Sequence, residues 1–170
     1  VGSYTDYVPG HPEQGFRWVG SQNPGKGIRA FELDEAGNLG DLAAEYKHYC
    51  PTWLEASPDG RFLLAPHDHG KNSAQGEGQI SAYSIEPTTG ELSLVSTQDT
   101  HGRGNTCLTF DRTGRYLLCT QYWEGGISVL PFNPEDGCIG KPTATITHLG
   151  QGPHPLRQSM PHPHGIYGDP

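Results

Sequence analysis

Short runs of alternating hydrophobic and polar residues, separated by turns that contain Pro and Gly, extend along most of the sequence. The turn segments Ser57-Pro58-Asp59-Gly60 and Pro87-Thr88-Thr89-Gly90 carry the residues that tight turns favour. Around them the alternation predicts four strands, at 52–56, 61–66, 79–85 and 92–97. Four short strands in about 50 residues are typical of one blade of a β-propeller.

The same four-strand unit recurs along the chain. The turn and second strand around Gly60 return around Gly114, 54 residues later, and the third strand around Ile80 returns around Ile127. An earlier copy of that third strand lies at 27–33. Three copies at a similar spacing predict a repeat fold.

We therefore predict an all-β fold of about three propeller blades, each with four antiparallel strands, as part of a larger propeller ring. The expected parts are an incomplete blade at 1–49, a full blade at 50–100, a full blade at 101–149, and a loop with the start of the next blade at 150–170. Within the incomplete blade we expect strands at 1–6, 27–34 and 41–47, with a loop at 7–26. In the last part, 164–167 should begin a first strand. Because an open ring leaves faces and edges uncovered, we expect the remaining half of the propeller, or another chain, to close it.

Composition agrees with many strands joined by many turns. Hydrophobic residues make up only 33% of the chain, which has 24 Gly and 15 Pro, and no segment has sustained helical periodicity. The net charge of −8 argues against nucleic acid and anionic membrane as partners, since both bind basic faces. The four Cys lack the spacing of a zinc site, and thiols without such a role favour a reducing, cytoplasmic location.

Four stretches of the sequence carry a family resemblance. They are VGSYT at 1–5, WLEASPDGR at 53–61, GISV at 126–129, and Arg157-Gln158 followed by His162-Pro163-His164. Together they resemble the lactonase family of seven-bladed β-propellers, which includes propeller-type 6-phosphogluconolactonases and 3-carboxy-cis,cis-muconate lactonizing enzymes. The resemblance covers essentially all 170 residues but only the N-terminal half of the family's length. It implies an enzyme that acts on a small anionic sugar lactone or a related acid.

The last stretch holds the candidate catalytic residues, His162, His164 and Arg157. In an extended segment, His162 and His164 would project to the same side, and an imidazole suits general acid–base chemistry near neutral pH. Arg157 could hold a carboxylate or phosphate through a bidentate fork. We also predict Arg157, Gln158 and Glu55 as substrate-binding residues, since Glu55 lies on a first strand that could face the channel. The alternative is that these side chains only hydrogen-bond loop backbone.

A metal site is a second interpretation of the histidines. His67-Asp68-His69 and His162-Pro163-His164 both have the His-x-His pattern, but each would need further ligands from elsewhere in the fold. We predict neither a metal nor another cofactor.

The sequence leaves three functions open. Lactone hydrolysis and muconate-type lactonization both need a proton donor and an anion clamp, so the same residues would serve either reaction. Gly165, Leu108 and Gln121 depart from the residues usual in the family, and they favour a third possibility, a non-catalytic propeller scaffold. A small anionic substrate is the partner that the first two functions require.

Overall fold

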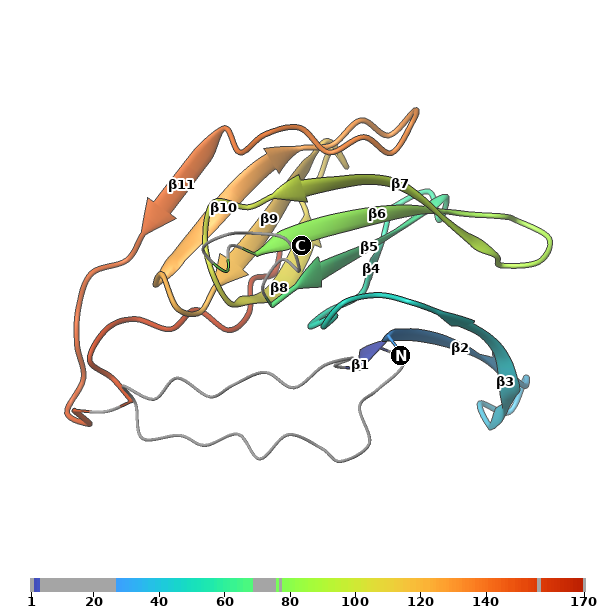
Figure 1. Cartoon of the computed structure of the whole chain (residues 1–170), viewed down its shortest axis with the longest axis horizontal. Helices are drawn as coiled ribbons and strands as arrows, with labels where there is room; N and C mark the ends of the chain where they lie inside the picture. Colours follow the sequence, from blue (N-terminus) through green and yellow to red (C-terminus); the bar gives the residue numbers. More distant parts are fainter. Residues whose placement is uncertain (1, 4–26, 69–75, 77, 156, 170) are drawn as a thin grey trace.

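The computed structural model describes residues 2–3, 27–68, 76, 78–155 and 157–169. These residues form three antiparallel sheets, and they include no helix that is long and apolar enough to cross a membrane. The strands are β1 (Gly2–Ser3), β2 (Gly27–Leu33), β3 (Leu39–Tyr46), β4 (Glu55–Ala56), β5 (Phe62–His67), β6 (Gln79–Ile85), β7 (Leu92–Asp99), β8 (Asn105–Phe110), β9 (Tyr116–Gln121), β10 (Gly126–Pro131) and β11 (Ala144–Thr147). Figure 1 shows the sheets following one another in chain order, from blue through green to orange.

Each sheet is a simple meander, because strands adjacent in sequence are also adjacent in the sheet. The first sheet has the order β1-β2-β3, the second β4-β5-β6-β7, and the third β8-β9-β10-β11. Each strand pairs antiparallel with its neighbour in sequence, which is the arrangement of propeller blades. The predicted all-β, antiparallel architecture is confirmed.

The repeated turns take the conformation that their sequence predicts. Gly60 N donates to the Ser57 carbonyl at 2.8 Å, and Gly114 N donates to the Asp111 carbonyl at 3.0 Å. Both glycines are left-handed, with φ of 72° and 68°, a region that favours Gly. Asp59 accepts hydrogen bonds from the Ser57 hydroxyl at 2.6 Å and from Arg61 N at 3.1 Å, so this carboxylate stabilises the turn.

The main core lies between the second and third sheets. Its buried members are Phe62, Leu64, Ile80, Ala82, Leu108, Leu117, Cys119, Leu130, Phe132 and Ile139. Phe132 packs edge-on against Phe62 and Phe110, with ring centroids 5.7 and 5.1 Å away. A smaller cluster of Ile28, Ala65 and Tyr83 joins the first sheet to the second. The sheets therefore stack face to face as successive blades.

A buried polar network joins the second and third sheets near the end of β9. Gln121 Nε2 donates to the Thr100 carbonyl at 2.9 Å and to the Ser128 hydroxyl at 2.7 Å. The Thr100 hydroxyl donates to Asn105 Oδ1 at 3.1 Å, and Asn105 Nδ2 donates to the Gln79 carbonyl at 3.1 Å. Because buried hydrogen bonds of this kind are costly to leave unmade, the network fixes the residues that follow Gln121.

One strand prediction needs correction, because the strand expected at 52–56 pairs only at Glu55–Ala56, and Pro51 adds an isolated bridge to His67. The strand expected at 164–167 stays a prediction, because none of the described strands pairs with this segment. Single hydrogen bonds hold that stretch along β8 instead, from the Thr106 hydroxyl to the Pro163 carbonyl at 3.1 Å and from Cys107 Sγ to the Ile166 carbonyl at 3.8 Å. The strand expected at 1–6 is described only at Gly2–Ser3, and the loop expected at 7–26 lies outside the described residues.

Candidate functional site

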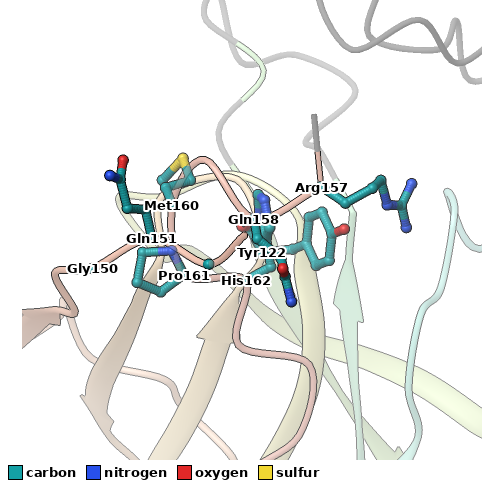
Figure 2. A pocket seen from close by; sticks show the side chains of 9 residues that line it. Tyr122, Gly150, Gln151, Arg157, Gln158, Met160, Pro161 and His162 are labelled. Carbon is teal, nitrogen blue, oxygen red and sulfur yellow. Dashed lines mark hydrogen bonds between the residues drawn. The ribbon is translucent and has the colours of Figure 1, made fainter. Parts of the chain in front are cut away.

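An open pocket of about 610 Å³ lies where the segment after β11 returns to the end of β9. Its lining residues are Tyr122, Gly150, Gln151, Gly152, Arg157, Gln158, Met160, Pro161 and His162. Figure 2 shows Tyr122, Gln158 and His162 gathered in the middle, with Arg157 extending outward on one side and Gln151 and Met160 on the other. Three predicted site residues, Arg157, Gln158 and His162, therefore line one pocket.

Gln158 closes the loop that carries Arg157. Its carbonyl accepts a hydrogen bond from Gly152 N at 2.8 Å, and its Oε1 accepts one from His154 N at 3.1 Å. A Cβ atom on Gly152 would lie only 2.6 Å from Gln158 Oε1, so the close approach requires glycine there. Arg157 N in turn donates to the His154 carbonyl at 3.2 Å and to His154 Nδ1 at 3.1 Å. The loop thus presents the exposed Arg157 at the pocket rim.

His162 is held by Tyr122 through two contacts. Its Nδ1–H donates to the Tyr122 carbonyl at 2.8 Å, and its ring stacks on the Tyr122 ring, with centroids 4.3 Å apart and planes 17° apart. Since a carbonyl can only accept, the Nδ1 atom carries the proton and the lone pair of the neutral ring is on Nε2. His162 Nε2 is buried and has no hydrogen-bond partner among the described residues.

Tyr122 is itself fixed by its neighbours. Tyr122 N donates to the Gly104 carbonyl at 2.8 Å, and the adjacent Trp123 N donates to the Arg103 carbonyl at 3.2 Å. The Trp123 ring packs edge-on to Tyr122 at 4.7 Å. A Cβ atom on Gly104 would lie 2.4 Å from Trp123 Cδ1, and Gly104 has a φ of 71°. Only glycine fits this position without displacing the indole ring.

His164 lies beside the pocket and is exposed. Its ring stands edge-on to the Tyr122 ring, with centroids 5.6 Å apart and planes 84° apart. Tyr122 therefore contacts both imidazoles of the His-x-His pair, His162 by its face and carbonyl and His164 by an edge.

Glu55 does not line this pocket. It lies on β4, where its Oε2 accepts a hydrogen bond from Trp53 Nε1 at 3.2 Å and its Oε1 accepts one from the Thr109 hydroxyl at 3.4 Å. Thr109 lies on β8, so Glu55 joins the first strands of the second and third sheets. Its substrate-binding role stays a prediction.

The metal interpretation gains no support from the described residues, which contain no group of three or more His, Cys, Asp or Glu able to hold a metal ion. One member of the first His-x-His motif, His69, lies outside the described residues.

Sequence reasoning missed Tyr122, which its repeat position could have identified. Tyr122 follows Asp68 by 54 residues, and Gly104 follows Cys50 by the same interval. In the structure Asp68 N donates to the Cys50 carbonyl at 3.2 Å, as Tyr122 N donates to the Gly104 carbonyl. In both sheets, the backbone N of the residue that follows the second strand thus donates to a carbonyl that precedes the first strand. In the third sheet, the pocket lies at this position.

Comparisons with known proteins agree with this architecture. The sequence matches the family described as "Lactonase, 7-bladed beta-propeller" over residues 1–170. This chain belongs to the lactonase family. It is 31% identical over 150 residues to a 6-phosphogluconolactonase of Bacillus subtilis, which covers 86% of this chain and 41% of the relative. It is 27% identical over 165 residues to a 6-phosphogluconolactonase of Formosa agariphila, again covering 41% of the relative and 96% of this chain.

Solved structures of similar proteins show the same fold. A candidate 6-phosphogluconolactonase from Bacteroides fragilis matches with a TM-score of 0.75 and 26% identity, over 95% of this chain and 39% of that one. The periplasmic gluconolactonase of Pseudomonas aeruginosa matches with a TM-score of 0.79 and 24% identity, over 100% of this chain and 43% of that one. At this identity the second match shows the fold alone. The chain thus spans about two fifths of the length of these relatives, and the resemblance expected from the sequence is confirmed.

Proposed function

We propose that this lactonase-family chain carries part of a site that hydrolyses a small anionic sugar lactone, with 6-phosphogluconolactone as the representative substrate. The observation that carries the proposal is that Arg157 and His162 line one pocket, with the His164 ring perpendicular to the Tyr122 ring that His162 stacks on. A guanidinium and two imidazoles suit a substrate that carries a carboxylate or phosphate. Relatives named 6-phosphogluconolactonase support the lactone class.

The proposed reaction needs one proton acceptor and one anion clamp. A water molecule attacks the lactone carbonyl carbon, the bond between that carbon and the ring oxygen breaks, and a carboxylic acid and a hydroxyl group result. An imidazole of the His162–His164 pair accepts the proton of the attacking water and returns it to the departing ring oxygen. Arg157 binds the anionic group at a distance from the reacting carbon, and Gln158 orients Arg157 by closing its loop.

We further propose that additional propeller blades, in the same polypeptide or in another chain, cover the open faces of these three sheets. Strand register places Leu33 opposite Leu39 and Phe31 opposite Leu42. Leu33 and Leu39 are 69% and 67% exposed, and exposed apolar faces of this kind mark an interface. We call the assembly with both faces covered the ring-completed protein.

We also propose that the protein is located in the cytoplasm. Within the described residues, Cys107, Cys119 and Cys138 form no disulfide, and Cys107 and Cys119 are buried. Free thiols are typical of reducing compartments. Fractionation of cells that express the ring-completed protein tests this location, and recovery in an oxidising compartment would contradict it.

The test of the proposed function is turnover of 6-phosphogluconolactone by the ring-completed protein, measured against spontaneous hydrolysis. We expect a rate well above background. Replacement of the whole pair, in a double variant with His162→Ala and His164→Ala, should remove it. His148→Ala serves as a matched control, because His148 is exposed and, among the described residues, only its backbone N is hydrogen-bonded, to the Gly125 carbonyl.

A folded, ring-completed protein without turnover above background would overturn the lactonase proposal. Muconolactone-type substrates would then test the cycloisomerase alternative, because muconate-type lactonization would use the same site, with a proton delivered to carbon rather than water delivered to the carbonyl. Failure with both substrate classes would leave a propeller scaffold without catalytic activity.

A further inference from the structure

The two imidazoles of the His-x-His pair occupy different environments. His162 is half-buried and stacked, whereas His164 is exposed and touches Tyr122 only edge-on. A third ring, that of Trp123, stands edge-on to His162 with centroids 6.2 Å apart. One imidazole is therefore enclosed by aromatic rings and the other is open to solvent.

Both nitrogens of His162 are withdrawn from proton exchange. Nδ1–H is engaged with the Tyr122 carbonyl, and Nε2, which carries the lone pair, is buried. A general base must reach the proton that it accepts, directly or through one water molecule. Neither nitrogen of His162 meets that condition, although its ring forms part of the pocket wall.

We propose that the two histidines divide the work of the proposed lactonase site, with His164 exchanging protons with the substrate and His162 acting as a positioning residue. His162 stacks on one face of Tyr122 and bonds to its carbonyl, which holds the phenol ring in a single orientation. His164 packs against an edge of that fixed ring. This inference rests on the proposed function for the role of His164, but the enclosure of His162 can be tested without any substrate.

The substrate-free test is modification by diethyl pyrocarbonate, which acylates accessible neutral imidazoles, followed by peptide mass spectrometry of the ring-completed protein. We expect His164 to react at least tenfold faster than His162. The exposed His148 serves as an internal reference for an open imidazole. Equal rates at His162 and His164, or faster reaction at His162, would overturn the proposal.

Two Tyr122 variants test the cause of the enclosure. Tyr122→Leu removes the stacked ring but keeps the backbone carbonyl, so reaction at His162 should accelerate. Tyr122→Phe keeps the ring and should preserve the protection, since the Tyr122 hydroxyl makes no hydrogen bond within the described residues. Acceleration in both variants, or in neither, would contradict the role of the ring.

The kinetic test separates this division of roles from the proposed function itself. His164→Gln should abolish turnover of 6-phosphogluconolactone, while His162→Phe, which keeps a stacking ring but no nitrogen, should retain turnover within about tenfold. The reverse pattern would overturn the division of roles. If the unsubstituted protein turns over no lactone, the proposed function fails, and the modification experiment alone decides whether His162 is enclosed.

Discussion

The imidazole rings of His48 and His67 lie 4.1 Å apart, centroid to centroid, between the first and second sheets. Both residues are buried. His48 Nδ1 shares a hydrogen bond of 2.7 Å with the Tyr83 hydroxyl, and His67 Nε2 shares one of 2.9 Å with the Ser81 hydroxyl. Burial, with a smaller contribution from the neighbouring His67, lowers the pKa of His48 from 6.5 to about 3. His48 therefore joins the two sheets in its neutral form near neutral pH.

This pair predicts acid sensitivity of the contact between the first two sheets. Between pH 6.5 and about 3 the unfolded chain binds a proton at His48 that the folded chain does not bind. The free energy of unfolding should therefore fall as the pH falls through that window, by up to about 1.4 kcal/mol per pH unit from this residue. Urea unfolding of the ring-completed protein at several pH values measures the slope.

Histidine variants test whether His48 causes this dependence of the unfolding free energy on pH. His48→Gln removes the titrating group and should flatten the dependence of unfolding free energy on pH in this window. His148→Gln is the control, because His148 is exposed, and its slope should match that of the unsubstituted protein. An unchanged slope in His48→Gln would contradict the assignment.

The core between the second and third sheets predicts how two leucine substitutions change the free energy of unfolding. Leu108 on β8 is fully buried within that cluster, so Leu108→Ala should leave a cavity and lower the free energy of unfolding by roughly 2–5 kcal/mol. Leu94 on β7 is 61% exposed, and Leu94→Ala should change the free energy of unfolding by less than about 0.5 kcal/mol. Equal losses in urea unfolding would show that the two sheets do not share this core.

The sequence predicted the sheets because turn chemistry and alternation are local signals. Gly60 and Gly114 end their turns in the left-handed conformation that the repeated motif requires. The segment 164–167 is unpaired among the described strands, because pairing depends on a neighbouring strand that local sequence does not reveal. Its hydrogen bonds reach β8 through Thr106 and Cys107 instead.

The candidate site was predictable only where its residues are close in sequence. Arg157, Gln158 and His162 lie within one short segment, and the structure places them at one pocket. Tyr122 lies 40 residues before His162, and only the return of the segment after β11 to the end of β9 brings their rings together. Gln158 was expected to bind substrate, and the hydrogen bonds that it accepts from Gly152 N and His154 N close the loop that carries Arg157.

The proposed anion clamp predicts a kinetic signature at Arg157. Arg157→Gln should raise the KM for 6-phosphogluconolactone at least tenfold, equivalent to about 1.4 kcal/mol of binding, because the guanidinium is expected to hold the anionic group. Arg157→Lys keeps the charge but loses the planar fork, so its KM should be intermediate. An uncharged lactone of the same ring size is the control substrate, and its KM should not respond. A similar rise in KM for both substrates would indicate damage to the loop rather than loss of the clamp.

Gly104 lies directly against the Trp123 ring. Gly104 and Gly90 have nearly the same backbone, with φ of 71° and 72°, so an alanine at either position carries a similar strain of roughly 1–2 kcal/mol. Their surroundings differ, because a Cβ atom on Gly104 would meet the Trp123 ring at 2.4 Å, while one on Gly90 has nothing within 4 Å. Gly104→Ala should therefore lower the free energy of unfolding more than Gly90→Ala does, and only Gly104→Ala should change the near-ultraviolet circular dichroism of the aromatic cluster. It should also speed the reaction of His162 with diethyl pyrocarbonate, since a displaced Trp123 uncovers that imidazole. Equal stabilities and unchanged spectra in the two variants would show that Trp123 does not hold Tyr122 and His162 in place.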